Sequence, residues 1–173
     1  MISVSGVQGT GKTTLARALA RNLGAMVLSR RPLMEALLAG GVPMNPPADS
    51  VLESLGVLAY ALMTALLQEQ IEIGQSVVIE CGVSEDIREK WRNIARAAGA
   101  TFIVVDTICS DVEVHRRRFE ARGPTWNGEI GQTWNTLDKA RSDFCPHPQA
   151  LFVADSVRPL QDNVDSILAL IEG

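Results

Sequence analysis

The sequence predicts a single-domain α/β fold in which helices cover both faces of a parallel sheet. Short apolar runs alternate with segments of helical periodicity along the whole chain, which is typical of successive strand–helix–strand units. The first apolar run leads directly into a glycine-rich loop and a helix, over residues 2–23. The chain has 173 residues, the length of one domain, and contains no repeat, linker or low-complexity tract. We therefore expect one domain over residues 1–173.

Five apolar runs give the expected strands, and the stretches between them give the helices. The strands are expected at residues 2–5, 25–28, 76–80, 101–106 and 150–154. The longest helix is expected over 49–73 and is apolar on more than one face. It forms core in the simpler interpretation, and in the alternative Tyr60 and its neighbours wall a substrate cavity or a subunit contact.

Local residues predict where the helices begin. Pro32 suits the first position of a second helix over 33–39, which places Arg31 at the N-cap. The other expected starts are Ser84 as a cap, Ser110 with Glu113 as a capping box, and Pro159 as a first residue.

Composition and charge weigh against several classes of protein. The net charge of −4 leaves no electrostatic footprint for duplex nucleic acid or an anionic membrane, although a local basic patch could still exist. The apolar run 55–67 is too short to span a bilayer. The three cysteines lack metal or redox spacing, and a strand from residue 2 leaves no room for a signal peptide. We therefore expect a cytoplasmic protein without a membrane partner, of undetermined oligomeric state.

Residues 6–13 carry the strongest motif, G-x-x-x-x-G-K-T, directly after the first strand. Its glycines let the backbone turn tightly and aim N–H groups at phosphate, and Lys12 supplies charge for the β- and γ-phosphates. The Thr13 hydroxyl can bind Mg²⁺, and the helix that follows directs its positive end at the anion. The predicted ATP-binding residues are Gly9, Thr10, Gly11, Lys12, Thr13 and Thr14. The segment predicts a nucleoside triphosphate site.

Two expected strands end in an acid, at Glu80 and at Asp106. Phosphoryl transfer needs an acid near the metal, and both acids would lie at the carboxyl edge of a parallel sheet, where ligands bind. The alternative is an acid that caps the next loop. Glu80 is the stronger candidate because an open turn follows it, and the structural alternative is favoured for Asp106.

Arg118 and Arg122 lie four residues apart on the fifth helix, so both can reach one ligand. Guanidinium groups bind phosphate in a bidentate manner, although cations also simply favour a helix C-terminus. We expect both to be catalytic, and we expect residues 123–143 to form a mobile lid.

Arg30 and Arg31 follow the second strand, again at the expected ligand edge. An arginine is a poor N-cap and sits badly at the positive end of a helix, and broken local rules sometimes mark functional sites. Two interpretations of these arginines are equally open: they contact the substrate, or they are simply exposed to solvent. His115 and His147 show no partner pattern, and neither has the setting of a catalytic base.

With these residues in view, the chain resembles the small P-loop kinases of the nucleoside monophosphate kinase-like fold. The nearest group is the AAA-type family shared by zeta-toxin-like, chloramphenicol phosphotransferase-like and polynucleotide kinase-like proteins. The matching segments are the loop 6–13, the strand and acid 76–80, the arginine-bearing helix 111–122, and the last strand and helix from 154. The resemblance implies a five-stranded parallel sheet of order 2-3-1-4-5 with a short lid.

One departure from this family concerns catalysis. Many relatives carry an aspartate just after the second strand, which accepts the proton of the substrate hydroxyl. Our alignment places Arg31 at this position and Met34 where an arginine usually follows. Catalysis therefore uses another acid, Glu80 or Asp86, or is weak or absent.

The sequence thus predicts an ATP- and Mg²⁺-dependent phosphotransferase acting on a hydroxyl of a small molecule. The expected catalytic residues are Lys12, Glu80, Arg118 and Arg122, the metal-binding residues are Thr13 and Glu80, and the substrate-binding residues are Arg30, Arg31, Tyr60 and Asp86. A 5′-hydroxyl polynucleotide kinase is one alternative, which the acidic charge balance disfavours. The other is a nucleotide-binding NTPase or switch that transfers no phosphate to an acceptor.

Overall fold

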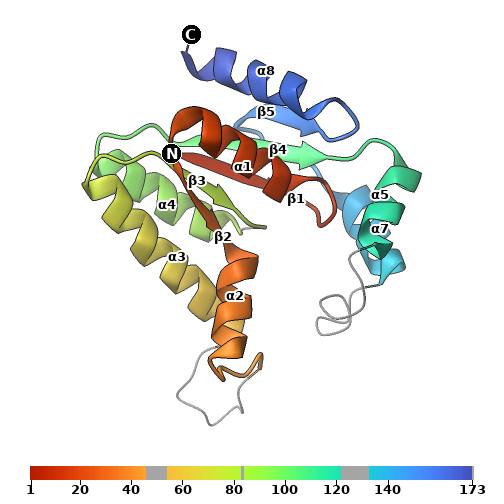
Figure 1. Ribbon diagram of the computed structural model, residues 1–173, viewed down its shortest axis with the longest axis horizontal. Helices are drawn as coiled ribbons and strands as arrows, with labels where there is room; N and C mark the ends of the chain where they lie inside the picture. Colours follow the sequence, from red (N-terminus) through yellow and green to blue (C-terminus); the bar gives the residue numbers. More distant parts are fainter. Residues whose placement is uncertain (46–53, 83, 122–132, 173) are drawn as a thin grey trace.

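The computed structural model describes residues 1–45, 54–82, 84–121 and 133–172. Five strands form one parallel sheet in the order β2-β3-β1-β4-β5 (Figure 1). They are β1 (Ile2–Gly6), β2 (Met26–Ser29), β3 (Val77–Glu80), β4 (Ile103–Ile108) and β5 (Ala150–Asp155). The predicted strands and their order are confirmed, with ends that differ by one or two residues.

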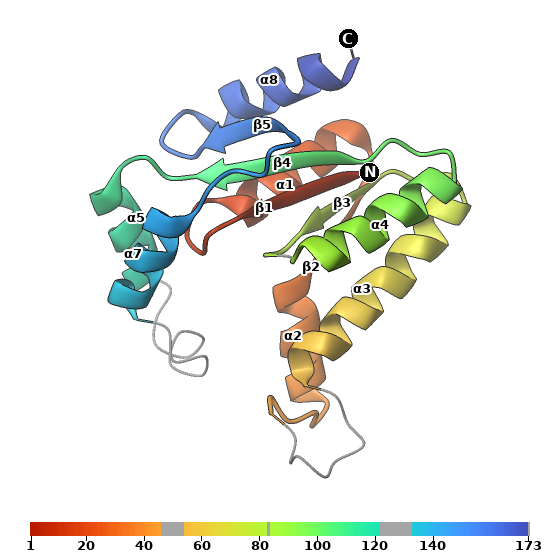
Figure 2. The same cartoon turned by 180° about the vertical axis from the view of Figure 1, so that it is seen from behind.

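The helices cover both faces of the sheet, as predicted. Helices α1 (Lys12–Leu23) and α8 (Leu160–Glu172) lie on one face, and α3 (Leu55–Glu72) and α4 (Glu85–Ala97) on the other (Figures 1 and 2). Helix α2 (Arg30–Ala39) continues from the carboxyl end of β2, whereas α5 (Val112–Glu120) and α7 (Trp134–Asp143) lie beyond that of β4. Two groups of helices therefore flank the edge at which the β1 loop emerges.

Side chains that alternate along the strands divide the core into two layers. Val4 and Val105 pack with Leu19 and Ile167 of the α1–α8 layer. Ile79 faces the opposite way and packs against Leu67 and Trp91 of the α3–α4 layer. Because apolar residues occupy both faces of the central strands, those strands read as continuous apolar runs.

Helix α2 begins two residues earlier than the sequence indicated. Ser29 is the N-cap residue and Arg30 begins the helix, so the prediction that Arg31 is the cap is wrong. Pro32 is the third helical residue, a position where its missing N–H breaks no intrahelical bond. Because β2 passes into α2 without a loop, Arg30 and Arg31 both stand on the first turn of the helix.

The start of α5 also differs from the prediction. Asp111 is the N-cap residue, and its side chain accepts a hydrogen bond from the Val114 N–H at 2.9 Å. The Ser110 N–H instead donates to Oδ1 of Asp155 at 3.1 Å, so Ser110 and Glu113 form no capping box. Asp is as good an N-cap residue as Ser, so the local sequence alone did not decide between the two neighbours.

Part of the segment expected to form a lid is helical. Thr133 and Thr136 form a capping box at the start of α7, and Leu137 is fully buried. Trp134 packs edge-on against His115, with 5.6 Å between the ring centroids. Residues 123–132 lie outside the described residues, as do 49–53 of the expected long helix. Movement of this segment as a lid stays a prediction.

Among the described helices, none combines the length and the apolar character that crossing a bilayer requires.

Candidate active site

The loop between β1 and α1 has a backbone that only glycine accommodates at key positions. Gly6 has φ +134°, and a Cβ there would lie 2.3 Å from the carbonyl oxygen of Thr107. Gly9 has φ +88°, and a Cβ there would lie 2.7 Å from the imidazole of His115. Both the positive φ angles and the close neighbours exclude a side chain. The glycines of the motif are therefore needed for packing against β4 and α5 as well as for phosphate access.

Side chains from β4 and α5 hold this loop in place. The Nε2–H of fully buried His115 donates to the carbonyl oxygen of Gln8 at 2.6 Å. The Thr10 hydroxyl donates to the carbonyl oxygen of Val7 at 2.7 Å and lies 2.6 Å from the hydroxyl of Thr107. The side chain of Thr10, expected to bind ATP, is thus committed inside the protein, and its backbone remains the candidate phosphate contact. His115 supports the loop, a role that the sequence did not indicate.

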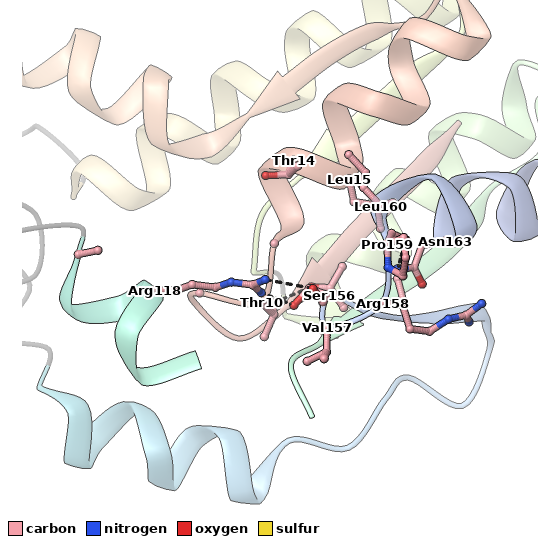
Figure 3. A pocket seen from close by; sticks show the side chains of 15 residues that line it. Thr10, Thr14, Leu15, Arg118, Ser156, Val157, Arg158, Pro159, Leu160 and Asn163 are labelled. Atoms are coloured by element: carbon pink, nitrogen blue, oxygen red, sulfur yellow. Dashed lines mark hydrogen bonds between the residues drawn. The ribbon is translucent and has the colours of Figure 1, made fainter. Parts of the chain in front are cut away.

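A cavity of about 710 Å³ adjoins one side of the loop (Figure 3). Its lining includes Gly9, Gly11, Thr14, Arg118 and residues 156–160 of the segment that joins β5 to α8. Its size falls in the range of small-ligand sites in proteins. We call it the donor cavity.

Arg118 connects two walls of the donor cavity. Its Nη1 donates to the Ser156 hydroxyl at 2.7 Å and its Nη2 to the Ser156 carbonyl oxygen at 3.1 Å (Figure 3). The guanidinium therefore lies in the predicted site, where it also positions the β5–α8 segment. Arg122, the other predicted catalytic arginine, lies outside the described residues.

A second cavity, of about 690 Å³, adjoins the same loop and is called the acceptor cavity below. The predicted residues Lys12, Thr13, Arg30, Arg31 and Glu80 all line it. Arg17, Glu35, Cys81 and Gly82 are further lining residues. The structure thus brings the lysine and threonine of the motif together with the acid of β3 and the arginines of α2.

Thr13 and Glu80 supply oxygen atoms that suit Mg²⁺. Glu80 is buried, with 7% of its surface exposed, and pairs in register with Val4 one strand away from the loop. Magnesium prefers a few protein oxygens together with water and substrate phosphate. Among the described residues, no group of three or more His, Cys, Asp or Glu side chains is placed to hold a metal. The Thr13 hydroxyl and the Glu80 carboxylate therefore suit a Mg²⁺ ion that binds together with a nucleotide.

Glu35 is a site residue that the sequence analysis missed. Arg31 Nε donates to Glu35 Oε1 at 2.7 Å, one helical turn along α2, and both side chains are about half exposed. The spacing of four residues was visible in the sequence, but Arg31 was expected outside the helix; because α2 begins at Arg30, both residues lie on it and line the same cavity. The acceptor cavity therefore contains a carboxylate on the element where the resemblance places an acid.

Arg30 lies against Tyr60 of α3. The carbon Cζ of Arg30 is 4.6 Å from the centroid of the Tyr60 ring, a cation–π geometry. The Tyr60 hydroxyl donates to the carbonyl oxygen of Gly82, in the turn after β3. Burial, followed by the nearby Cys81 thiol, raises the pKa of Tyr60 above its usual value. Two of the predicted substrate-binding residues thus form one structural unit.

Cys81 is a buried thiol in the wall of the acceptor cavity. Burial and the neighbouring negative charge of Glu80 raise its pKa to about 12. A thiol of this kind is neutral near pH 7 and is a poor nucleophile. Cys81 therefore shapes the cavity and supplies no reactive group.

Asp86 stands apart from this site. It is exposed on the first turn of α4 and is not among the described residues that line either cavity. A hydrogen bond from the Ser84 side chain lowers the pKa of its carboxyl group. Binding of substrate by Asp86 stays a prediction.

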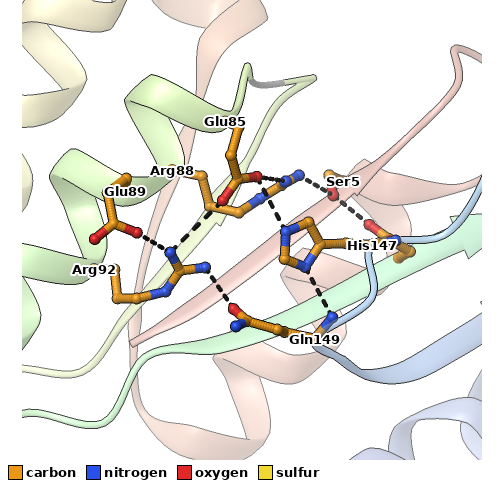
Figure 4. Close-up of polar contacts among 8 residues, drawn as sticks. Ser5, Glu85, Arg88, Glu89, Arg92, His147 and Gln149 are labelled. Carbon is orange, nitrogen blue, oxygen red and sulfur yellow. Dashed lines mark hydrogen bonds and ion pairs between the residues drawn. The ribbon is translucent and has the colours of Figure 1, made fainter.

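A polar network joins α4 to the segment before β5 (Figure 4), and Asp106 is hydrogen-bonded to two of its members, Ser5 and His147. Asp106 accepts hydrogen bonds from the Ser5 hydroxyl and, at 2.5 Å, from the His147 N–H. Glu85 accepts from Arg88 at 2.6 Å, and its Oε2 lies 3.0 Å from Nε2 of His147. Asp106 is thus engaged in structural hydrogen bonds, although with β1 and the segment before β5 rather than as a cap of the loop that follows its own strand. Glu80 remains the strand-end acid available to a metal.

Comparisons with known proteins agree with this architecture. A family model described as an AAA domain matches residues 1–145. No curated protein sequence matches the chain.

Solved structures share the fold at low sequence identity. A kinase candidate from Chloroflexus aurantiacus is 21% identical with a TM-score of 0.73, over 99% of this chain and 94% of that one. The APS kinase of Mycobacterium tuberculosis, in complex with AMPPNP and APS, is 17% identical with a TM-score of 0.69, over 99% and 96%. A gluconokinase from Sinorhizobium meliloti is 20% identical with a TM-score of 0.60, over 99% and 90%. The fold is that of P-loop kinases.

Proposed function

Since the chain belongs to the AAA domain family, we propose that it is an ATP- and magnesium-dependent phosphotransferase that acts on a hydroxyl of a small molecule. The observation that carries the proposal is the pair of cavities that adjoin one phosphate-binding loop. A phosphotransferase needs a nucleotide on one side of the transferred group and an acceptor on the other. A switch protein needs only the first. The second cavity, lined by Lys12 and Thr13, therefore favours transfer over nucleotide binding alone.

In the proposed complex, the nucleotide occupies the donor cavity and its phosphates lie on the loop. The backbone N–H groups of residues 9–13 bind the phosphates, and Lys12 neutralises charge on the β- and γ-phosphates. Thr13 and Glu80 hold the Mg²⁺ that accompanies ATP. Arg118 and Arg122 stabilise the charge of the transferring group, as the sequence predicted.

The acceptor hydroxyl lies in the acceptor cavity. Its oxygen forms a bond to the γ-phosphorus while the bond from that phosphorus to the bridging oxygen breaks and ADP leaves. The proton of the hydroxyl passes to a carboxylate, for which Glu35 is our candidate because it lines this cavity on the first turns of α2. Arg30 and Arg31 hold the acceptor from the same helix.

The neighbours in structure support the same class of reaction. Their names describe kinases of APS, gluconate and shikimate, which are small molecules. One of them was solved with AMPPNP, an ATP analogue.

The test is transfer of γ-labelled phosphate from ATP across a panel of nucleosides, sugars, hydroxy acids and single-stranded oligonucleotides. The expected result is a phosphorylated small molecule whose formation requires Mg²⁺ and disappears in Lys12→Ala. Arg21→Ala, an exposed arginine of α1 outside both cavities, is the matched control. Normal transfer by Lys12→Ala would contradict the role of the loop. ATP hydrolysis without any labelled acceptor would favour an NTPase or switch protein. Labelling of an oligonucleotide would favour a 5′-hydroxyl polynucleotide kinase.

A further inference from the structure

The guanidinium of Arg30 occupies a space that the neighbouring helix leaves open. Arg30 lies over the ring of Tyr60, and its Nη2 is 2.7 Å from the point where a Cβ on Gly56 would stand. An alanine at position 56 would therefore displace the guanidinium. The aromatic face and the glycine, both on α3, hold the side chain against one wall of the acceptor cavity.

Arg30 differs from its neighbours in having no counter-ion within the part of the chain that the structure describes. Its Nε is buried and has no hydrogen-bond acceptor among the described residues, and none of their carboxylates lies within ion-pair distance of Arg30. Arg31 by contrast pairs with Glu35, and Arg88 with Glu85. A partly desolvated cation without an anion is unfavourable, because burial removes water that nothing replaces. A bound anion would remove this cost.

The charges around the acceptor cavity also favour an anion. Four of its lining side chains are cationic (Lys12, Arg17, Arg30 and Arg31) and two are anionic (Glu35 and Glu80). The proposed function assigns Lys12 to the phosphates and Glu80 to the metal, and Arg31 is paired with Glu35. Arg17 is exposed, so Arg30, with its buried Nε, is the partly buried cation that remains for the acceptor, in a protein whose net charge is −4.

We propose that the acceptor is a hydroxyl compound that carries an oxyanion, a carboxylate or a phosphate, and that Arg30 binds this group. This proposal rests on the proposed function. The planar guanidinium forms paired N–H···O bonds with such groups, and stacking on Tyr60 fixes its plane. The anion would be held beside α3 while the hydroxyl reaches toward Lys12 and Thr13, which line the same cavity.

The first experiment compares acceptors in matched pairs. Gluconate is paired with sorbitol to test a carboxylate, and a nucleoside 5′-monophosphate with its nucleoside to test a phosphate. We expect kcat/KM to be at least about tenfold higher for one anionic member than for its neutral partner. Arg30→Gln should raise KM for that acceptor by roughly tenfold or more with little change in kcat. Arg21→Gln carries the same charge change outside the site and should leave both constants unchanged.

The inference of an anionic acceptor would be overturned if the anionic and neutral members of every active pair were phosphorylated equally well and Arg30→Gln affected both alike. The proposed kinase activity would still stand. Absence of transfer to all acceptors would instead contradict the proposed function. The inference is then decided by binding of inorganic sulfate to protein loaded with Mg·AMPPNP, which fills the phosphate-binding loop. Sulfate binding that Arg30→Gln weakens by about tenfold and Arg21→Gln preserves would support it. Equal binding to both variants, or no binding to the unchanged protein, would overturn it.

Discussion

Arg31 Nε donates to Glu35 Oε1 at 2.7 Å on the first turns of α2, and both side chains line the acceptor cavity. The resemblance to P-loop kinases indicates an acid near position 31, where this chain has an arginine. The structure shows a carboxylate one helical turn later, held by that arginine. An acid therefore lines the acceptor cavity although the expected position lacks one.

Glu35→Gln should reduce kcat for phosphate transfer by about 100-fold or more, because a general base contributes a factor of that order. The amide keeps the size of the side chain and cannot accept the proton. ATP affinity should not change, since Glu35 is absent from the described lining of the donor cavity. Single-turnover transfer to the best acceptor, together with nucleotide binding, measures both quantities.

Glu120→Gln is the matched control for this change. Glu120 also pairs with an arginine four residues away, Arg116, at 2.9 Å and with similar exposure, but it lies outside both cavities. Arg31→Asp in the Glu35→Gln background returns the acid to the position that the family indicates and should recover part of the lost rate. Full activity of Glu35→Gln would exclude Glu35 as the base and leave Glu80 and Asp86.

Gly56→Ala should weaken acceptor binding without destabilising the protein. Alanine favours the helix over glycine by up to about 1 kcal/mol, so the free energy of unfolding should not fall. The added methyl would nevertheless lie 2.7 Å from Arg30 Nη2 and displace the guanidinium. We expect a higher KM for an anionic acceptor at nearly constant kcat, measured beside a thermal melt. An unchanged KM would show that Arg30 can bind its ligand from another position.

The sequence predicted the elements whose signals are local. Apolar runs marked all five strands, and the glycine-rich motif joins β1 to α1 as its position in the sequence predicted. The order of the strands came from the family resemblance, because periodicity alone carries no information on which strands are neighbours.

The contacts that define the site were not predictable from such patterns. His115 is 107 residues from Gln8, whose carbonyl oxygen it binds, and Arg30 meets Tyr60 from a different helix. Hydrophobic periodicity predicts which face of a single helix or strand is buried. It therefore does not predict which side chains of different elements contact each other. The contact between Arg31 and Glu35 was hidden by an error of two residues in the start of α2, which had placed Arg31 outside the helix.

Thr64→Val should lower the free energy of unfolding by about 1–3 kcal/mol. Trp91 is fully buried between α3 and the sheet, and its indole N–H donates to the Thr64 hydroxyl at 2.9 Å. Valine has the same shape but leaves this N–H without an acceptor. Urea unfolding measures the change, and Thr64→Ser, which keeps the hydroxyl, should lose less. Stability equal to that of the unchanged protein in Thr64→Val would mean that the indole finds another partner.

Iodoacetamide at pH 8 should modify the exposed Cys145 well before Cys81. The thiolate is the reacting form, and a pKa of about 12 leaves roughly one Cys81 thiol in 10,000 ionised at that pH. Because the pH stays below the raised pKa, the Cys81 rate should increase nearly tenfold for each unit between pH 8 and 10. Peptide mass spectrometry over time measures each site separately. Blocked access to a thiol of ordinary pKa, about 8.5, would instead give a slow rate that levels off above roughly pH 9, so a plateau in the Cys81 rate would indicate blocked access and not a raised pKa. Equal rates at both cysteines at pH 8 would contradict the buried position of Cys81 in the cavity wall.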